Sequence, residues 1–160
     1  MEGPADVDLR CSVVVFRGES VLLVHRTRDG ADDWVLPGGS PRPGESMAAC
    51  AQREALEEAG LPVDPARVAF VLESHAPGAR RRAVDLVFLA TETTTDTVPA
   101  RLAPRERENG LAPMFVALAE LPGLILRPPL AGHLRSLRTR GPARTAAYLG
   151  NLWRPLAAER

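Results

Sequence analysis

GGSPRPGESMAACAQREALEEAGL, at residues 38–61, begins as a loop and continues as a helix. Its two leading glycines let the backbone approach a ligand closely, and the prolines that follow keep the first part of the stretch in a loop. Ser46 or Glu45 caps the predicted helix and places negative charge at its positive end. The helix continues to about Ala59, and Gly60 ends it as a C-terminal capping glycine. The stretch therefore predicts a loop followed directly by a capped helix.

One face of this helix carries three glutamates, Glu54, Glu57 and Glu58. At about 100° per residue, their carboxylates fall within an arc of about 100°. Like charges so arranged repel one another and raise each other's pKa unless a cation lies among them. Carboxylate oxygens suit a hard divalent ion, Mg²⁺ or Mn²⁺. The alternative interpretation is a solvated acidic helix face, which the charges alone do not exclude. Small residues on the other side let the helix pack closely on a sheet: Ala48, Ala51, Ala55 and Ala59.

The composition is that of an ordinary globular domain. The chain has 160 residues, 45% hydrophobic and 25% charged, and its formal net charge is zero. Zero net charge argues against a non-specific binder of nucleic acid polymers or membranes, which needs an excess of basic residues. All 20 basic residues are arginines, which excludes a lysine-based phosphate loop and Schiff-base chemistry. We expect a single domain over residues 1–160.

The chain ends and the cysteines bear on the cellular compartment. Residues 1–8 are polar and are expected to fray, and the acidic N-terminus has no apolar core, unlike a signal peptide. No apolar run approaches the ~18 residues of a membrane span. Cys11 and Cys50 form no pattern, which is typical of a reduced protein. We therefore expect a cytoplasmic protein without a membrane partner.

Apolar runs ahead of the central stretch predict strands. Leu9–Phe16 and Val21–Val24 flank a short turn and indicate a hairpin that is covered on both faces. Arg26, at the end of the second run, either contacts a phosphate or is solvated. A polar loop is expected at Thr27–Asp33, followed by a short strand at Trp34–Leu36.

The second half of the chain predicts further strands and a helical C-terminal part. Arg67–Ser74 and Arg82–Ala90 are both expected to be strands. Thr91–Gly110 is a long polar loop of the kind that forms lids or binds substrates. Met114–Val116 is expected to be a short strand and Ala117–Leu121 a helical turn. A C-terminal helical segment is expected over residues 129–160. It contains a helix from Leu130 to Arg140 and a last helical piece from about Ala143.

The stretch from Gly39 to Leu61 resembles the signature of the Nudix hydrolase family, G-x5-E-x7-R-E-U-x-E-E-x-G-U, where U is a bulky apolar residue. Every glycine and charged position matches over these 23 residues, and only Ala55, at the first U position, departs from the pattern. The letters WVLPGG that lead into the stretch also resemble the family. The resemblance implies an α/β protein, an α/β/α sandwich around a mixed β-sheet.

The resemblance also implies a reaction, the hydrolysis of a pyrophosphate bond in a nucleoside diphosphate derivative with Mg²⁺ or Mn²⁺ as cofactor. Two adjacent phosphates carry too much negative charge for water or a base to approach without a metal. Arg53 would orient the glutamates, Glu45 would brace Arg53 and the loop, and Arg26, Gly38 and Gly39 would contact the substrate together with Glu45. The implied metal ligands are Glu54, Glu57, Glu58 and a backbone carbonyl of Gly38 or Gly39.

The implied general base is a glutamate of the signature or of the later loop. Glu108, ahead of an aromatic strand, is the favoured loop candidate and joins Arg53, Glu54 and Glu57 in the expected catalytic set. Glu106 is a second candidate, and loop acids that are merely solvated are the alternative.

The sequence leaves the substrate open among a nucleoside triphosphate, ADP-ribose and a nucleotide sugar. Pro77, sixteen residues after Leu61, either marks the ADP-ribose pyrophosphatase subgroup or is a turn proline. A catalytically silent nucleotide-binding or regulatory module on this fold is the alternative function. An isoprenoid diphosphate isomerase shares the fold, but its cysteine and glutamate context is not evident. The expected partners are a small nucleotide and, by general frequency, a second copy in a homodimer.

Overall fold

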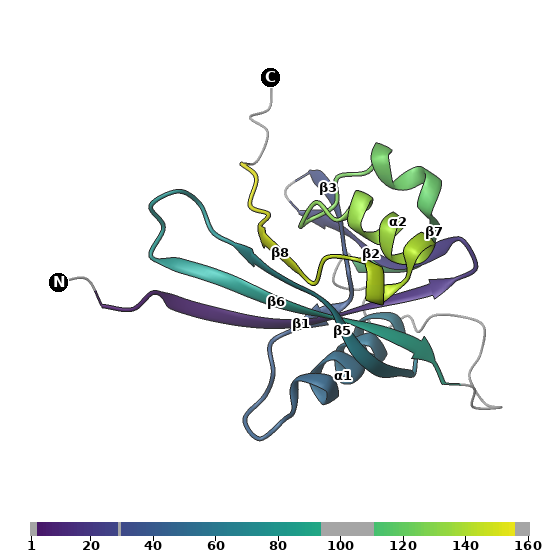
Figure 1. Cartoon of the computed structure of the whole chain (residues 1–160), viewed down its shortest axis with the longest axis horizontal. Helices are drawn as coiled ribbons and strands as arrows, with labels where there is room; N and C mark the ends of the chain where they lie inside the picture. The colour runs from purple at the N-terminus through teal and green to yellow at the C-terminus, as the bar shows by residue number, and fades with distance from the viewer. Residues whose placement is uncertain (1–2, 29, 94–110, 156–160) are drawn as a thin grey trace.

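The computed structural model describes residues 3–28, 30–93 and 111–155. Its elements, in chain order, are β1 (Asp6–Arg17), β2 (Ser20–Arg28), β3 (Ala31–Val35), β4 (Gly38–Gly39), α1 (Met47–Ala59), β5 (Val63–Ser74), β6 (Arg81–Glu92), β7 (Leu111–Ala117), η2 (Leu118–Gly123), α2 (Ala131–Arg140), η3 (Pro142–Arg144) and β8 (Tyr148–Asn151). The strands form one mixed sheet in the order β3-β2-β1-β6-β5-β8, with β4 beside β1 and β7 beside β2 (Figure 1). β1 runs parallel to β6, and β5 runs parallel to β8.

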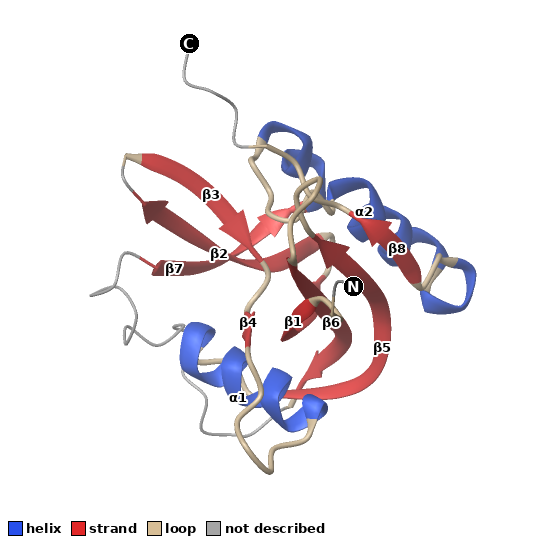
Figure 2. Ribbon diagram, turned by 90° about the vertical axis from the view of Figure 1, so that its left-hand side faces the viewer, coloured by secondary structure: helices blue, strands red, loops and turns tan. Residues whose placement is uncertain are grey.

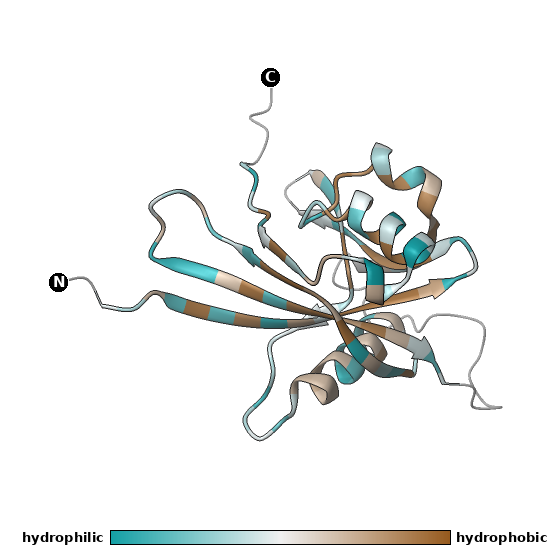
Figure 3. Ribbon diagram, in the orientation of Figure 1, coloured by the Kyte–Doolittle hydropathy of each residue, from teal (hydrophilic) through white to brown (hydrophobic). Residues whose placement is uncertain are grey.

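Both faces of the sheet are covered. In β1, Val13 and Val15 contribute to the core that includes α1, whereas Val14 contributes to the core that includes α2. Figures 1 and 2 show α1 on one side of the sheet and α2 with η2 on the other, and Figure 3 shows hydrophobic strand segments between these layers. Burial on both faces explains why the strand sequences are apolar runs without alternation. The α/β/α sandwich around a mixed sheet is confirmed.

The helix α1 begins and ends as its sequence predicts. The Ser46 hydroxyl accepts a hydrogen bond from the Ala49 N–H at 3.1 Å, and Gly60 adopts a left-handed conformation with φ of 65°. The alanine side of the helix is buried against the sheet. Ala55 is fully buried there, so a bulkier residue at this departure from the signature would push the helix away from the sheet.

The polar stretch Thr27–Asp33 is part of a strand hairpin, so the loop predicted there is wrong. β2 continues to Arg28 and β3 starts at Ala31. Polar side chains pair across the two strands, as in the hydrogen bond of Thr27 to Asp32 at 2.9 Å. Cross-strand pairing of this kind stabilises strands whose composition is polar.

The expected fraying of residues 1–8 is also wrong from Asp6 onward. Asp6–Arg10 pair with Arg81–Asp85 of β6 in the parallel register. The side chain of Asp8 is bonded to Arg81, and Asp6 lies 3.5 Å from Arg80. The backbone ladder and these surface ion pairs hold the start of β1 on the sheet.

The C-terminal part combines a helix with a strand. α2 lies within the predicted range, and its buried side chains are Leu134 and Leu137. The predicted last helical piece is wrong at Tyr148–Asn151, which form β8 along the edge of β5. Backbone groups at this edge gain partners when β8 adds to the sheet, as shown by the bond of Leu152 N–H to Glu73 O at 2.9 Å.

The arginines of α2 lie at the protein surface. Arg138 donates to Gly18 O at 2.9 Å and lies 3.1 Å from Glu19. In the ranges that the structure describes, no helix has the length and apolar character needed to cross a membrane.

Candidate active site

The strand β4 fixes the start of the central stretch against β1. Gly38 pairs with Ser12, and Gly39 pairs with Cys11. A Cβ atom on Gly38 would lie 2.6 Å from Cys11 O and 2.8 Å from Ser12 Cα, both backbone atoms. Only glycine therefore allows the two strands to come this close.

Gly39 is required for a different reason. A Cβ atom on Gly39 would lie 2.3 Å from Glu54 Oε1 and 2.6 Å from its Cδ. The carboxylate of Glu54 therefore lies directly on the backbone of β4, on the side where α1 packs. The sequence predicted that the glycine backbone would be approached closely by a ligand. In the structure, the carboxylate of Glu54 makes this close approach.

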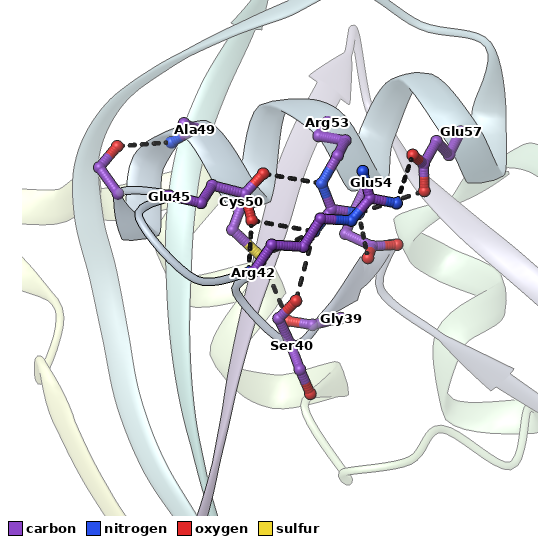
Figure 4. Close-up of polar contacts among 10 residues, drawn as sticks. Gly39, Ser40, Arg42, Glu45, Ala49, Cys50, Arg53, Glu54 and Glu57 are labelled. Atoms are coloured by element: carbon purple, nitrogen blue, oxygen red, sulfur yellow. Dashed lines mark hydrogen bonds and ion pairs between the residues drawn. The ribbon is translucent and has the colours of Figure 1, made fainter.

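Arg53 links the loop to the acidic face of α1 (Figure 4). Its Nε and Nη2 donate to the two oxygens of Glu45 at 2.7 and 3.0 Å, and Nη1 donates to Glu54 at 2.8 Å and to Glu57 at 3.2 Å. Nη2 also donates to Ser40 O at 3.2 Å. A guanidinium presents its donors in a planar fork, so one side chain fixes three carboxylates and the loop backbone together.

The bonds from Arg53 shift the proton equilibria of this cluster. The hydrogen bonds from Arg53, followed by one from the Arg42 N–H, lower the pKa of Glu45 to about 2. Its bond to Glu45 raises the pKa of Arg53 above the ordinary value. Both groups therefore stay charged across the physiological pH range.

The two remaining glutamates flank this brace. Glu57 is exposed and also accepts from Arg42 Nη2 at 3.3 Å. Glu58 is half-buried and accepts from the Gly38 N–H at 3.3 Å. The structure thus brings Glu54, Glu57 and Glu58 to the same side of α1, next to β4.

The donors of this site fit a divalent cation in kind. Hard cations prefer carboxylate and carbonyl oxygens, and the site offers three carboxylates close to the glycine backbone. Within the described ranges, no three acidic, histidine or cysteine side chains are gathered as a ready metal cluster. The carboxylates accept hydrogen bonds from Arg53, Arg42 and the Gly38 N–H.

Cys50 is a buried thiol that hydrogen-bonds the backbone of β4. Its Sγ donates to Gly39 O at 3.4 Å. Burial, followed by the neighbouring thiol of Cys11, raises the pKa of Cys50 to about 12. The raised pKa favours the protonated thiol over the thiolate, which is the form that attacks or binds metal. Sequence reasoning missed this contact, which no motif signals.

A cavity of about 980 Å³ lies on the other face of the sheet. Its apolar wall comes from η2 and the segment that leads to α2, with Trp153 from the C-terminal part. Arg10, Arg26 and Asp85 line its polar side. Asp85 interrupts the apolar strand VDLVFLA, and this interruption is the sequence signal that could have identified it.

β4 contacts both the acidic face and the cavity lining. Gly39 touches Glu54, as described above, and Gly38 touches the Ser12 hydroxyl. That hydroxyl donates to Asp85 in the cavity at 2.8 Å. β4 thus lies between the Glu54 carboxylate and the hydrogen bond of Ser12 to Asp85.

Arg26 lies in the cavity wall as one half of an ion pair. Its Nε and Nη2 donate to the two oxygens of Asp33, both at 2.8 Å. Arg127 approaches the same carboxylate at 3.3 Å. The Arg26 guanidinium is therefore paired with a carboxylate and is not simply solvated. Its contact with a phosphate stays a prediction.

The sequence-based candidates in the later loop have mixed outcomes. Glu106 and Glu108 lie outside the described residues, so their roles stay predictions. Glu92 is the last residue of β6, so the strand extends two residues into the predicted loop Thr91–Gly110, and its carboxylate accepts from Arg17 Nε at 3.0 Å. Pro77 is in a turn in which the Ala79 N–H donates to Ala76 O at 3.1 Å, which supports its interpretation as a turn proline.

Comparison with known proteins identifies a domain and several relatives. The NUDIX domain matches residues 8–137. The human 8-oxo-dGDP phosphatase NUDT18 is 41% identical over 100 residues, which cover 58% of this chain and 29% of NUDT18. The human diphosphoinositol polyphosphate phosphohydrolase 3-alpha is 33% identical over 108 residues, which cover 66% of this chain and 65% of that protein. This chain thus spans less than two thirds of the length of either relative.

Solved structures show the same architecture. A NUDIX hydrolase from Nitrosomonas europaea has a TM-score of 0.67 at 20% identity, with 87% of this chain and 90% of that chain covered. An ADP-ribose pyrophosphatase from Streptococcus suis has a TM-score of 0.63 at 25% identity, with 92% and 98% covered. The likeness at this level of identity concerns the fold.

Proposed function

Because this chain belongs to the Nudix hydrolase family, we propose that it hydrolyses a pyrophosphate bond in a nucleoside diphosphate derivative, with Mg²⁺ or Mn²⁺ as cofactor. The observation that carries the proposal is the brace at Arg53. One guanidinium joins Glu45 of the loop to Glu54 and Glu57 of α1. A merely solvated acidic helix face would not need one arginine to hydrogen-bond three glutamates.

Different residues of the site would bind the metal and position its ligands. Glu54, Glu57 and Glu58 would hold the divalent cation together with the backbone carbonyl of Gly39. When bound, the cation would neutralise the diphosphate and lower the pKa of a coordinated water molecule. Arg53 is a positioning residue, since it contacts the carboxylates and the loop.

The general base that takes the proton from water is one of two kinds of residue. We keep Glu108 as the loop candidate, and a glutamate of the acidic face as the other. A general base contributes about 10²–10⁴-fold to the rate, so a substitution at either position has a measurable effect.

The cavity favours a nucleoside over a heavily phosphorylated ring. Arg26 and Arg127 both pair with Asp33, and Arg10 lies 3.7 Å from Asp85. These three paired cations offer little to a ring with many phosphates, and Arg154, which also lines the cavity, donates to Trp153 O at 2.9 Å. The apolar wall suits a planar base. Nucleoside triphosphates, ADP-ribose and nucleotide sugars are therefore the substrates to test first.

A substrate panel tests the proposal. Nucleoside di- and triphosphates, 8-oxo-dGDP, ADP-ribose, a nucleotide sugar and a diphosphoinositol polyphosphate are incubated with enzyme and Mg²⁺, and released phosphate and nucleoside monophosphate are measured. We expect turnover of at least one nucleotide that disappears on chelation of the metal. Absence of turnover of every substrate at high enzyme concentration would favour the silent binding module instead.

A further inference from the structure

Asp85 is a buried charge close to the backbone that leads into β4. Among the residues that the structure describes, only Ser12 and Asp85 are buried and polar, with 0% and 5% of their surface exposed. Burying a carboxylate costs free energy unless its oxygens are hydrogen-bonded. Burial raises the pKa of Asp85 to about 6, so the carboxylate is mostly ionised near pH 7.5. A charge kept inside the protein at this cost indicates a role that an apolar side chain would not fill.

Asp85 fixes two side chains of the neighbouring strand β1. The Ser12 hydroxyl donates to the oxygens of Asp85 at 2.8 and 3.0 Å. Arg10 lies opposite Asp85 in the parallel register, with Nε 3.7 Å from Oδ2. Arg10 Nε also donates to Ser12 Oγ at 3.2 Å. The carboxylate thus determines where both the hydroxyl and the guanidinium lie.

Both of these side chains contact the backbone just ahead of and within β4. Arg10 Nη2 donates to Leu36 O at 3.0 Å. Ser12 Oγ lies 2.5 Å from the position that a Cβ atom on Gly38 would take, so the hydroxyl packs directly on this glycine. The two contacts hold this backbone from the face of the sheet that carries the cavity, where Arg10 and Asp85 are part of the lining.

The acidic face of α1 contacts the same backbone from the other side. The Gly38 N–H donates to Glu58 Oε2 at 3.3 Å, and Gly39 lies against the carboxylate of Glu54. The proposed metal site also includes the backbone carbonyl of Gly39. Because the peptide unit between the two glycines is planar and stiff, a shift of Gly38 on the cavity side would move the carbonyl and the glutamate contacts on the α1 side.

We propose that Asp85, through Ser12 and Arg10, is a positioning residue for the proposed metal site on the opposite face of the sheet. It sets the place of β4 relative to the glutamates of α1. The inference rests on the proposed function for its link to metal binding and turnover. An apolar side chain at this position would leave the Ser12 hydroxyl without its acceptor and Arg10 without its counter-charge, so β4 would gain freedom to move.

Asp85→Ala and a matched core variant test the inference. Val116→Ala opens a cavity in the core on the same face of the sheet, but on β7, which pairs with β2. Binding of Mn²⁺, followed by electron paramagnetic resonance, should weaken about tenfold in Asp85→Ala and stay at the wild-type value in Val116→Ala. At saturating Mg²⁺, kcat of Asp85→Ala should fall about tenfold while KM changes by less than about threefold, because alignment is lost and the substrate contacts are kept.

Amide hydrogen exchange of the Gly38 N–H gives a readout that needs neither metal nor turnover. Measured by NMR at a temperature at which the variants are folded, exchange should be about tenfold faster in Asp85→Ala than in the wild type, and unchanged in Val116→Ala. Arg10→Met, which removes the bond to Leu36 O, should shift both readouts in the same direction. Adding it to Asp85→Ala should cost little more, because the two residues act through one chain of contacts.

Each outcome supports or overturns the inference. Unchanged Mn²⁺ affinity and unchanged Gly38 exchange in Asp85→Ala, or equal losses in Val116→Ala, would show that Asp85 only supports the fold. If Asp85→Ala does not fold, Arg10→Met decides by the same two measurements. Faster Gly38 exchange in Asp85→Ala, in a protein that binds no Mn²⁺ and has no turnover, would leave Asp85 as the residue that positions β4 and refute the proposed function.

Discussion

Gly39→Ala should separate the chemistry of the site from the stability of the fold. The added Cβ would lie 2.3 Å from Glu54 Oε1, whereas ordinary contacts begin at 3.4 Å. The carboxylate would have to retreat by about 1 Å from its place between Gly39 and Arg53. A displacement of about 1 Å in a catalytic group can cost about 10²-fold in rate. We therefore expect a fall of about 100-fold in kcat with the fold intact.

Gly38→Ala is the matched control for this variant. Its Cβ would meet backbone atoms, Cys11 O at 2.6 Å and Ser12 Cα at 2.8 Å, so the strands β1 and β4 would have to separate. Overpacking of this kind costs about 1–3 kcal/mol, and each kcal/mol lowers Tm by about 2–4 °C in a domain of this size. Thermal unfolding and metal-dependent turnover of both variants provide the test. A Gly39→Ala protein with kcat near the wild-type value would refute the placement of Glu54.

Three further outcomes are expected. Glu57→Gln should abolish metal-dependent turnover while circular dichroism stays unchanged, and a near-normal kcat would exclude Glu57 as a ligand. Arg53→Lys keeps the charge but loses the fork, so kcat should fall at least tenfold, whereas Arg138→Lys, on the surface of α2, should behave like the wild type. Since burial raises the pKa of Asp85 from 3.8 to about 6, the folded state holds the extra proton, and this group's contribution to stability falls as pH rises from about 4 to about 6. Urea unfolding should show that the wild type loses on the order of 3 kcal/mol of stability relative to Asp85→Asn between about pH 4 and about pH 6. A stability difference that does not change with pH would contradict the burial cost assigned to Asp85.

The loop and helix at residues 38–61 could be predicted from the sequence because their interactions are between residues close together in the chain. Ser46 and Gly60 cap α1 through interactions within a few residues of the helix ends, so their positions alone are informative. The spacing of Arg53 and the glutamates likewise places them on one helix face. Sequence reasoning therefore anticipated which residues meet around Arg53, although not that Arg42 joins them.

Long-range pairing explains what the sequence did not reveal. Ser12 and Asp85 are 73 positions apart, and only the parallel pairing of β1 with β6 brings them together. β8 forms because β5 offers an open edge, while the short segment Tyr148–Asn151 has no strong strand pattern of its own. Polar residues at Thr27–Asp33 resembled a loop, because their partners across the hairpin are visible only once the strands are paired.

Mn²⁺ binding tests the central claim, that the acidic face of α1 is a divalent metal site, most directly. Electron paramagnetic resonance would follow the titration of Mn²⁺ into the wild type, into the double variant Glu54→Gln/Glu57→Gln, and into Glu92→Gln as a control of equal chemistry away from the site. We expect saturable binding to the wild type and to Glu92→Gln, with binding to the double variant weakened at least tenfold. A double variant that binds Mn²⁺ as tightly as the wild type would contradict the claim.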